Sequence, residues 1–270
     1  MRLILRSLAE IVSVLSVFLL SGAAVAGGII WSYSNDLPGF EKLQDYEPPV
    51  TSRVHAGDGR LIGEFAREWR LYLPISAVPQ NVIEAYISAE DKNFYRHGGL
   101  DLAGLARAAL SNLRNAGSGR RPQGASTITQ QVAKNFLVGT EASLERKIRE
   151  ALVALRIEGA YSKDKILELY LNSIYLGAPT PGRGSYGIAA AALNYFNKSV
   201  HELELREAAY LAALPKAPTD LHPFRNRERA IERRNYVIDR MVENGYVERE
   251  AGEEAKRQSL GVTPYAVSPN

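Results

Sequence analysis

A long stretch without charged residues near the N-terminus constrains this chain more than any other feature. Between Glu10 and Asp36 there is no acidic or basic residue, and residues 11–31 are almost wholly apolar. A helix of about 20 apolar residues is long enough to cross the hydrocarbon core of a bilayer. We therefore expect a single transmembrane anchor over residues 11–31, preceded by a short tail at residues 1–10.

The charges on either side of this stretch predict its orientation. Arg2 and Arg6 precede it, and acidic residues up to Glu47 follow it. Because basic flanks stay in the cytoplasm, the tail at 1–10 is expected inside and the rest of the chain outside. The alternative is a cleaved signal peptide, since Ala24-Val25-Ala26 has the small-x-small pattern of a cleavage site. Both interpretations export the region that follows.

The composition excludes several classes of protein. The chain has 270 residues, no cysteine, 46% hydrophobic and 23% charged residues, and a formal net charge of +3. It is therefore neither a disulfide-stapled mini-protein nor a disordered tail. Acidic and basic residues are mixed along most of the chain rather than segregated, so nucleic acid is not expected as a partner.

The residues after the span predict a linker, a hairpin and then a helical domain. Residues 32–75 contain a proline-rich linker and two short strands around Gly57-Asp58-Gly59, a turn that needs positive φ. From Pro79 onward, apolar residues recur at helical spacing, which predicts a mainly α domain over residues 76–250. Residues 251–270 are expected to form a C-terminal tail, the beginning of a region that continues beyond Asn270.

Two adjacent acids, Glu90 and Asp91, end the first predicted helix of this domain. A carboxylate at a helix C-terminus feels the negative end of the helix dipole, and if it is also partly desolvated it binds its proton more tightly. Those are the properties of a general base that works near neutral pH, and Glu90 is the candidate. The alternative is a solvated acid pair with His97 as a satisfied helix cap.

A second polar segment begins at Gly124 and predicts a helix start. Thr127 followed by Gln130 three residues later has the pattern of a capping box, and free amides at a helix start attract phosphate. Lys134 lies two turns further on and could reach an anion held near that face. A well-capped surface helix explains the hydroxyls but not the polar run from Thr129 to Gln131, which suits a site that presents amides to sugar hydroxyls.

A third segment places Arg146 and Glu150 one helical turn apart. Charge ladders of this kind are usually solvated helix faces. The alternative is that Glu150 is a second functional carboxylate, balanced by Arg146 and Lys147, whose charges could hold a diphosphate leaving group. Ser162 precedes a further helical segment and is interpreted as its N-terminal cap.

Together these segments resemble the glycosyltransferase family 51 domain of penicillin-binding proteins and monofunctional peptidoglycan glycosyltransferases. Five motifs of that domain match in order between Val82 and Pro218, and the resemblance extends to the hairpin and to the basic helix 227–241. Asn197 stands where the family commonly has glycine. The matching motifs are Glu90-Asp91-x-x-Phe94-x-x-His97-x-Gly99-x-Asp101, Gly124-x-Ser126-Thr127-Ile128-Thr129-Gln130-Gln131 with Lys134-Asn135, Arg146-Lys147-x-x-Glu150, Ile166-Leu167-Glu168-x-Tyr170-Leu171-Asn172 and Arg206-Glu207-Ala208-Ala209-Tyr210-Leu211-Ala212.

The resemblance implies a mainly α, lysozyme-like bilobal fold with a small membrane-facing lobe. It implies an enzyme that polymerises lipid II into glycan strands by inverting transfer, with release of polyprenyl diphosphate, at the outer face of the bacterial cytoplasmic membrane. Glu90 would be the general base, and Glu150 would orient the leaving group or assist its departure. The substrate-binding positions carried over are Asp91, Phe94, His97, Ser126, Thr127, Gln130, Gln131, Lys134, Arg146, Lys147, Asn172 and Arg206.

The same resemblance implies no obligatory cofactor and no protein metal ligand, and it allows a divalent cation, Mg²⁺ or Mn²⁺, at the diphosphate. The partners it implies are lipid II, the growing lipid-linked glycan and the membrane, with other cell-wall synthesis proteins as candidates. Two alternatives stay open: a lysozyme-like enzyme that cleaves glycan, which needs no cations for a diphosphate, and a non-catalytic anchored scaffold for cell-wall proteins.

Overall fold

The computed structural model is mainly helical, as the sequence predicts. It describes residues 52–55, 57–58, 61–65, 69–117, 124–138, 143–180 and 184–263, with scattered residues between 10 and 37. Within these residues, no helix is long and apolar enough to cross a membrane. The predicted span at residues 11–31 lies partly outside the described residues.

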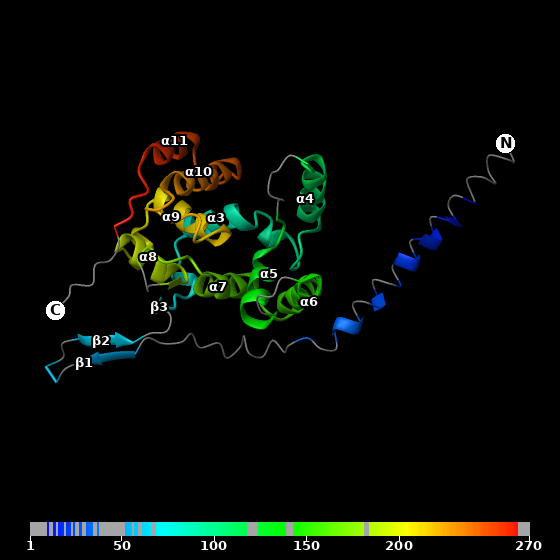
Figure 1. Cartoon of the computed structure of the whole chain (residues 1–270), viewed down its shortest axis with the longest axis horizontal. Helices are drawn as coiled ribbons and strands as arrows, with labels where there is room; N and C mark the ends of the chain where they lie inside the picture. The colour runs from blue at the N-terminus through cyan, green and yellow to red at the C-terminus, as the bar shows by residue number, and fades with distance from the viewer. Residues whose placement is uncertain are drawn as a thin grey trace.

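Two pairs of short strands accompany the helices. β1 (Ser52–His55) and β2 (Leu61–Phe65) pair in the antiparallel sense, so the predicted hairpin is confirmed, and in Figure 1 it lies apart from the helical body. β3 (Trp69–Arg70) pairs in parallel with β4 (Ser185–Tyr186). The second pair ties the chain that enters the helical body to the segment before α8 (Ile188–Phe196).

One set of helices packs around α9 (Leu205–Ala213). It contacts both α3 (Gln80–Glu90) and α10 (Arg227–Glu243), and α11 (Arg249–Arg257) packs on α10 (Figure 1). These contacts bury large side chains completely, Tyr86 on α3 and Tyr210 on α9 among them. Helix α11 crosses the boundary expected at residue 250, so the packed part of the chain continues beyond it.

A second set of helices packs around α5 (Ile128–Ala133). It contacts α6 (Leu144–Ala160) and α7 (Lys163–Ser173), and it continues directly into one π-helical turn, η3 (Lys134–Val138). The buried ring of Tyr170 on α7 meets that of Tyr86 on α3 edge to face, with 6.1 Å between the ring centroids. The two sets therefore share one hydrophobic core. Four short 3₁₀ turns complete the described part: η1 (Ile75–Ala77), η2 (Phe94–Arg96), η4 (Val200–Glu202) and η5 (Leu214–Lys216).

Side-chain caps fix where several helices begin. The predicted capping box is present: Thr127 Oγ1 accepts the Gln130 N–H, and Gln130 Oε1 accepts the Thr127 N–H. The predicted cap Ser162 accepts the Lys165 N–H at the start of α7. Each cap satisfies an amide that the first helical turn leaves without a partner, typically worth about 1 kcal/mol.

Asn197 ends α8 in the left-handed conformation, with φ of +54°. Glycine is the usual residue at this position because it has no Cβ to clash, and asparagine is the side chain that best tolerates the same conformation. The departure from the family pattern at this position is therefore compatible with the helix end that glycine would form.

Helix α4 (Leu102–Arg114) differs from the others because most of its large apolar side chains are exposed. Ala108 is the one residue of α4 that is buried, whereas Leu102 and Leu113 are more than 70% exposed. Leu105 and Leu110 are also exposed on this helix. In Figure 1 α4 stands at the margin of the helical body.

Candidate active site

A cavity of about 540 Å³ opens where the two sets of helices meet. Its walls come from the end of α3, the start of α4, the start of α5, the first turns of α6, the turn η5 and one face of α10. It collects most of the site residues predicted from the sequence. Those that line it are Glu90, Asp91, Ser126, Thr127, Gln130, Gln131, Lys134, Arg146, Lys147 and Glu150.

Glu90 is the last residue of α3 and keeps partial access to the cavity. Burial raises the pKa of its carboxyl above the ordinary value of 4.5. A hydrogen bond from Gln131 and the positive charges of Arg233 and Lys216 lower this pKa without cancelling the effect of burial, and the charge of Asp91 raises it further. The result is a carboxylate with more proton affinity than a solvated glutamate.

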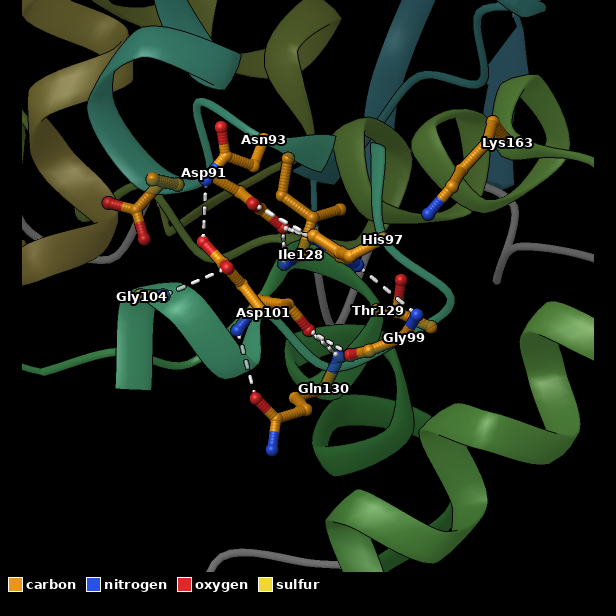
Figure 2. Close-up of polar contacts among 12 residues, drawn as sticks. Asp91, Asn93, His97, Gly99, Asp101, Gly104, Ile128, Thr129, Gln130 and Lys163 are labelled. Carbon is orange, nitrogen blue, oxygen red and sulfur yellow. Dashed lines mark hydrogen bonds and ion pairs between the residues drawn. The ribbon is translucent and has the colours of Figure 1, made fainter. Parts of the chain in front are cut away.

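Asp91 is buried and joins three segments (Figure 2). Its carboxylate accepts the N–H of Ile128, the first residue of α5, at 3.0 Å, and it contacts His97 Nε2 at 3.0 Å. His97 Nδ1 accepts the Gly99 N–H at 3.2 Å, so Nε2 carries the ring proton and donates to Asp91. Burial raises the pKa of Asp91, while the contacts with His97 and Ile128 oppose that change.

The start of α4 is held close to this network. Asp101 accepts the Gly104 N–H at 2.9 Å and the Asn93 side-chain amide at 2.9 Å (Figure 2). Burial alone would raise the pKa of Asp101, but these two hydrogen bonds, together with His97 and the charge of Arg107, outweigh burial and lower the pKa. Asp101 is thus a helix cap on the wall of the cavity, charged and already supplied with donors.

The two neighbouring glutamines of α5 point to different partners. Gln130 is buried and its side-chain oxygen belongs to the capping box, while Thr127 Oγ1 also donates to the Gly99 carbonyl at 2.6 Å. Gln131 instead directs its amide into the cavity, where Nε2 donates to Glu90 Oε2 at 2.8 Å. The side-chain oxygen atoms of Thr127 and Gln130 are thus used to build the helix start.

The wall formed by α6 is cationic around one buried carboxylate. Glu150, 1% exposed, pairs with both Arg146 and Lys147, and the Lys147 Nζ to Glu150 Oε2 distance is 2.6 Å. Lys147 also donates to Ser126 Oγ at 3.2 Å. Burial, together with the charges of Arg146 and Lys134, lowers the pKa of Lys147. The predicted pairing of Arg146 with Glu150 across one helical turn is confirmed.

Sequence reasoning missed a second group of basic side chains in the cavity. Lys216 of η5 and Arg233 and Arg240 of α10 line it, together with Tyr236, whose ring lies 4.4 Å from the Arg233 guanidinium carbon. The spacing of 233, 236 and 240 places them on one face of a helix, a signal that the sequence does carry. The sequence shows that residues 227–241 are basic but does not show which face of this helix meets the site.

Four predicted residues do not line the cavity. Phe94 is fully buried, and His97 acts through Asp91. Asn172 exchanges two hydrogen bonds of 2.8 Å with the backbone of Leu73, and Arg206 donates to Glu204 and to the Ser259 carbonyl. These contacts make Asn172 and Arg206 parts of the surrounding packing.

The cavity wall favours anions and offers little to a metal ion. Its lining contains eight basic residues and four acidic ones, and three of the acids, Asp91, Asp101 and Glu150, already have partners. In the described part of the chain, no group of three or more His, Cys, Asp or Glu side chains could hold a metal. The arrangement can accept a proton at Glu90 and hold negative charge against the basic residues that line the same cavity.

Known proteins are similar in sequence to this chain over most of its length. A family model described as transglycosylase matches residues 58–242. Penicillin-binding protein 1A of Rickettsia felis is 50% identical over 250 residues, 93% of this chain and 31% of that protein. Penicillin-binding protein 1A of Aquifex aeolicus is 49% identical over 230 residues, 85% of this chain and 30% of that protein.

A solved structure is also similar. The crystal structure of penicillin-binding protein 1A from Haemophilus influenzae aligns with a TM-score of 0.46 and 28% identity, covering 82% of this chain and 22% of that one. The chain spans about a third of the length of the curated relatives it matches. The family match covers more than half of the chain, as the five ordered motifs predicted. The chain belongs to the transglycosylase family, glycosyltransferase family 51.

Proposed function

We propose that this domain is a peptidoglycan glycosyltransferase, which polymerises lipid II into glycan strands by inverting transfer and releases polyprenyl diphosphate. The observation that carries the proposal is the position of Glu90, a carboxylate of raised pKa in a cavity whose other charged residues are mainly cations. A base of this kind is suited to take a proton from a neutral hydroxyl near pH 7. The cations around it are suited to a diphosphate.

In the proposed reaction Glu90 removes the proton of the acceptor sugar's 4-hydroxyl. The oxygen forms a bond to the anomeric carbon of the lipid-linked chain, and the bond from that carbon to the diphosphate oxygen breaks. The electron pair of the broken bond goes to the diphosphate. Lys134, Arg146 and Lys147 line the same cavity and would stabilise that developing charge. Such preorganised groups act where charge develops, which is usually the largest contribution to catalysis.

Glu150 has a different role in this proposal. Its carboxylate is buried and held by Arg146 and Lys147. We assign it to orienting those cations toward the leaving diphosphate. No step is assigned to a metal ion, although Mg²⁺ or Mn²⁺ could accompany the diphosphate as part of the substrate.

The remaining predicted residues divide by their contacts. Ser126 and Lys134 line the cavity and are proposed to face substrate, whereas Gln131 lines it with its amide bonded to Glu90. Thr127, Gln130, Asp91 and His97 are proposed to hold the walls in place, because their polar atoms bond to one another or to the backbone. Phe94, Asn172 and Arg206 are proposed to support the packing from outside the cavity.

The membrane is the proposed location of this activity, because both substrates carry long lipids. We propose that residues 11–31 anchor the chain in the bacterial cytoplasmic membrane with the N-terminus inside, and that the catalytic domain lies outside. The exposed leucines of α4 support a lipid-facing surface next to the cavity, which α4 also lines through Arg107. Anchoring at the surface where the substrates lie raises the rate of encounter.

The proposal also includes a lysozyme-like, two-lobed arrangement and a place within a longer protein. The two curated relatives described above are about three times as long as this chain, and both are penicillin-binding proteins 1A. Other cell-wall synthesis proteins are proposed partners of such a protein.

The test is a polymerisation assay with the purified chain in detergent, lipid II and the matched variant Glu90→Gln, with products resolved by length. We expect glycan polymer from the wild type and a rate lower by about 10³-fold or more from the variant, because a positioned base supplies roughly 10²–10⁴-fold, with circular dichroism unchanged. Shortening of added glycan would indicate a cleaving enzyme instead. No polymer from a folded wild-type chain would favour the scaffold.

A further inference from the structure

Of the two neighbouring glutamines on α5, one donates a hydrogen bond to Glu90. Gln130 and Gln131 are both amides on α5, yet Gln130 closes the capping box and Gln131 donates to Glu90 Oε2 at 2.8 Å. Among the described residues, Glu90 Oε1 makes no hydrogen bond. The two oxygens of the carboxylate are therefore not equivalent.

The contact between Gln131 and Glu90 is one half of a two-point attachment between α3 and α5. The other half joins Asp91, the residue after Glu90, to the first residue of α5: the Ile128 N–H donates to Asp91 Oδ2 at 3.0 Å. Residues 128 and 131 are three apart and lie on one face of α5, opposite the two adjacent acids. Asp91 is in turn fixed by His97, so the end of α3 has little freedom to turn relative to α5.

We propose that Gln131 is a positioning residue that holds Glu90 by Oε2 and leaves Oε1 as the oxygen that takes the acceptor's proton. This inference rests on the proposed glycosyl transfer. In that step the hydroxyl proton passes to Oε1, the hydroxyl oxygen bonds to the anomeric carbon, and the diphosphate leaves with the electron pair. Gln131 gives up no proton and forms no bond to substrate. Its contribution is the orientation of the base.

The groups that face Glu90 come from four elements besides α5. They are Arg233 on α10, Lys216 on η5, Tyr86 and the neighbouring Asp91 at α3, and Tyr170 on α7. The cations and the Gln131 amide lower the pKa of Glu90, and burial and Asp91 raise it. Removing the amide leaves the other groups unchanged, so the pKa of Glu90 must rise. A base with a raised pKa loses activity on the acidic side of its pH profile.

The experiment measures the pH dependence of kcat and of kcat/KM for lipid II polymerisation with the full 270-residue chain in detergent. Gln131→Met keeps the length of the side chain and removes the donor. We expect kcat at neutral pH to fall roughly tenfold, a part of the roughly 10²–10⁴-fold that a positioned base supplies. We expect the acidic limb to move to higher pH. Gln131→Lys keeps a donor and adds a positive charge, so its acidic limb should move to lower pH.

Gln130→Met is the matched control, since it removes the same amide one residue away. It breaks the capping box and should lower the melting temperature without moving the acidic limb. If Gln131→Met raises KM and the acidic limb of its pH profile stays where it is in the wild type, Gln131 binds substrate and the inference is wrong. Equal shifts in Gln130→Met and Gln131→Met would also overturn it, because both would then follow from a loosened helix start.

A second measurement separates this inference from the proposed function. A water-soluble carbodiimide reacts with protonated carboxyl groups, and mass spectrometry of the peptide containing Glu90 gives the labelling rate at each pH without any substrate. The labelling profile of Gln131→Met should move to higher pH even if the chain polymerises nothing. An unchanged profile would contradict the role of Gln131, whatever the outcome of the polymerisation assay.

Discussion

The two glutamates of the cavity sit in opposite electrostatic surroundings. Glu90 has partial access to the cavity and accepts one neutral amide, and burial raises its pKa. Glu150 is 1% exposed and contacts two cations, Arg146 and Lys147. A carboxylate whose pKa is raised and which is not paired with a cation can act as a base, whereas one bound to two cations holds those cations in place. Identical side chains therefore have different chemistry because of their neighbours.

The largest expected effect separates the two glutamates by activity. Glu90→Gln should lower kcat by about 10³-fold or more, because the amide cannot accept the hydroxyl proton, and a positioned base contributes roughly 10²–10⁴-fold. Glu150→Gln should retain more activity, since Arg146 and Lys147 remain. Steady-state kinetics with lipid II at one pH measures both. Equal losses in the two variants would remove the distinction.

The same two substitutions should affect stability in the opposite order, with the larger loss at Glu150. Glu150→Gln leaves two cations without their carboxylate, and breaking a buried ion pair costs about 3–5 kcal/mol. Lys147 is half exposed, so we expect about 2–3 kcal/mol, measured as the free energy of unfolding in urea. If Glu150→Gln is as stable as the wild type, the pairing contributes nothing to the fold.

Glu90→Gln should not destabilise the protein above neutral pH. Folding raises the pKa of Glu90, so the ionised carboxylate costs stability once the pH exceeds its ordinary value of 4.5, and the cost is complete above the raised value. The variant should therefore gain stability relative to the wild type as pH increases. Melting temperatures from pH 5 to pH 8 measure this difference, and a widening loss would contradict the raised pKa.

Lys147 allows a test on the alkaline side. Its pKa is lowered by burial and by the charges of Arg146 and Lys134, so it loses its proton at lower pH than an ordinary lysine. If its charge stabilises the leaving diphosphate, activity should fall over the pH range in which Lys147 loses its proton. Lys147→Arg stays charged and should extend the active range to higher pH. An alkaline limb that does not move would assign that limb to another group.

The smallest effect is expected at Asp91, which connects the end of α3, next to Glu90, to α5 and His97. Asp91→Asn keeps one acceptor for the Ile128 N–H but loses the charged contact with His97. We expect a loss of about 1–2 kcal/mol in unfolding free energy, as for a weakened buried hydrogen bond. Chemical denaturation with His97→Gln as the matched variant measures it. Losses that add fully in the double variant would show that the two residues are not coupled.

Local chemistry made much of this structure predictable. The capping box at Thr127, the cap at Ser162, the hairpin and the helix that ends at Glu90 all depend on residues close together in the sequence. The pairing of Arg146 with Glu150 depends on one helical turn. In each of these cases the partners are separated by a few residues, so the periodicity of a helix or a turn determines which of them meet.

The residues that sequence reasoning missed depend on long-range packing. Lys216, Arg233 and Arg240 reach the cavity because α10 packs against α3, and nothing in residues 227–241 indicates that contact. The different roles of Gln130 and Gln131 follow from the position of Glu90, 41 residues away in the sequence. A motif marks such a segment as important, but the packing decides which side chain faces the site.

The most direct test of the central claim is the pH dependence of polymerisation for the wild type and for Glu90→Gln, measured as kcat from pH 4 to pH 8. The account predicts a wild-type rate that rises with pH through an apparent pKa above the ordinary glutamate value of 4.5, and a residual rate in Glu90→Gln without this limb. The same limb in both proteins would show that another group takes the proton, and the assignment of Glu90 as the base would be wrong.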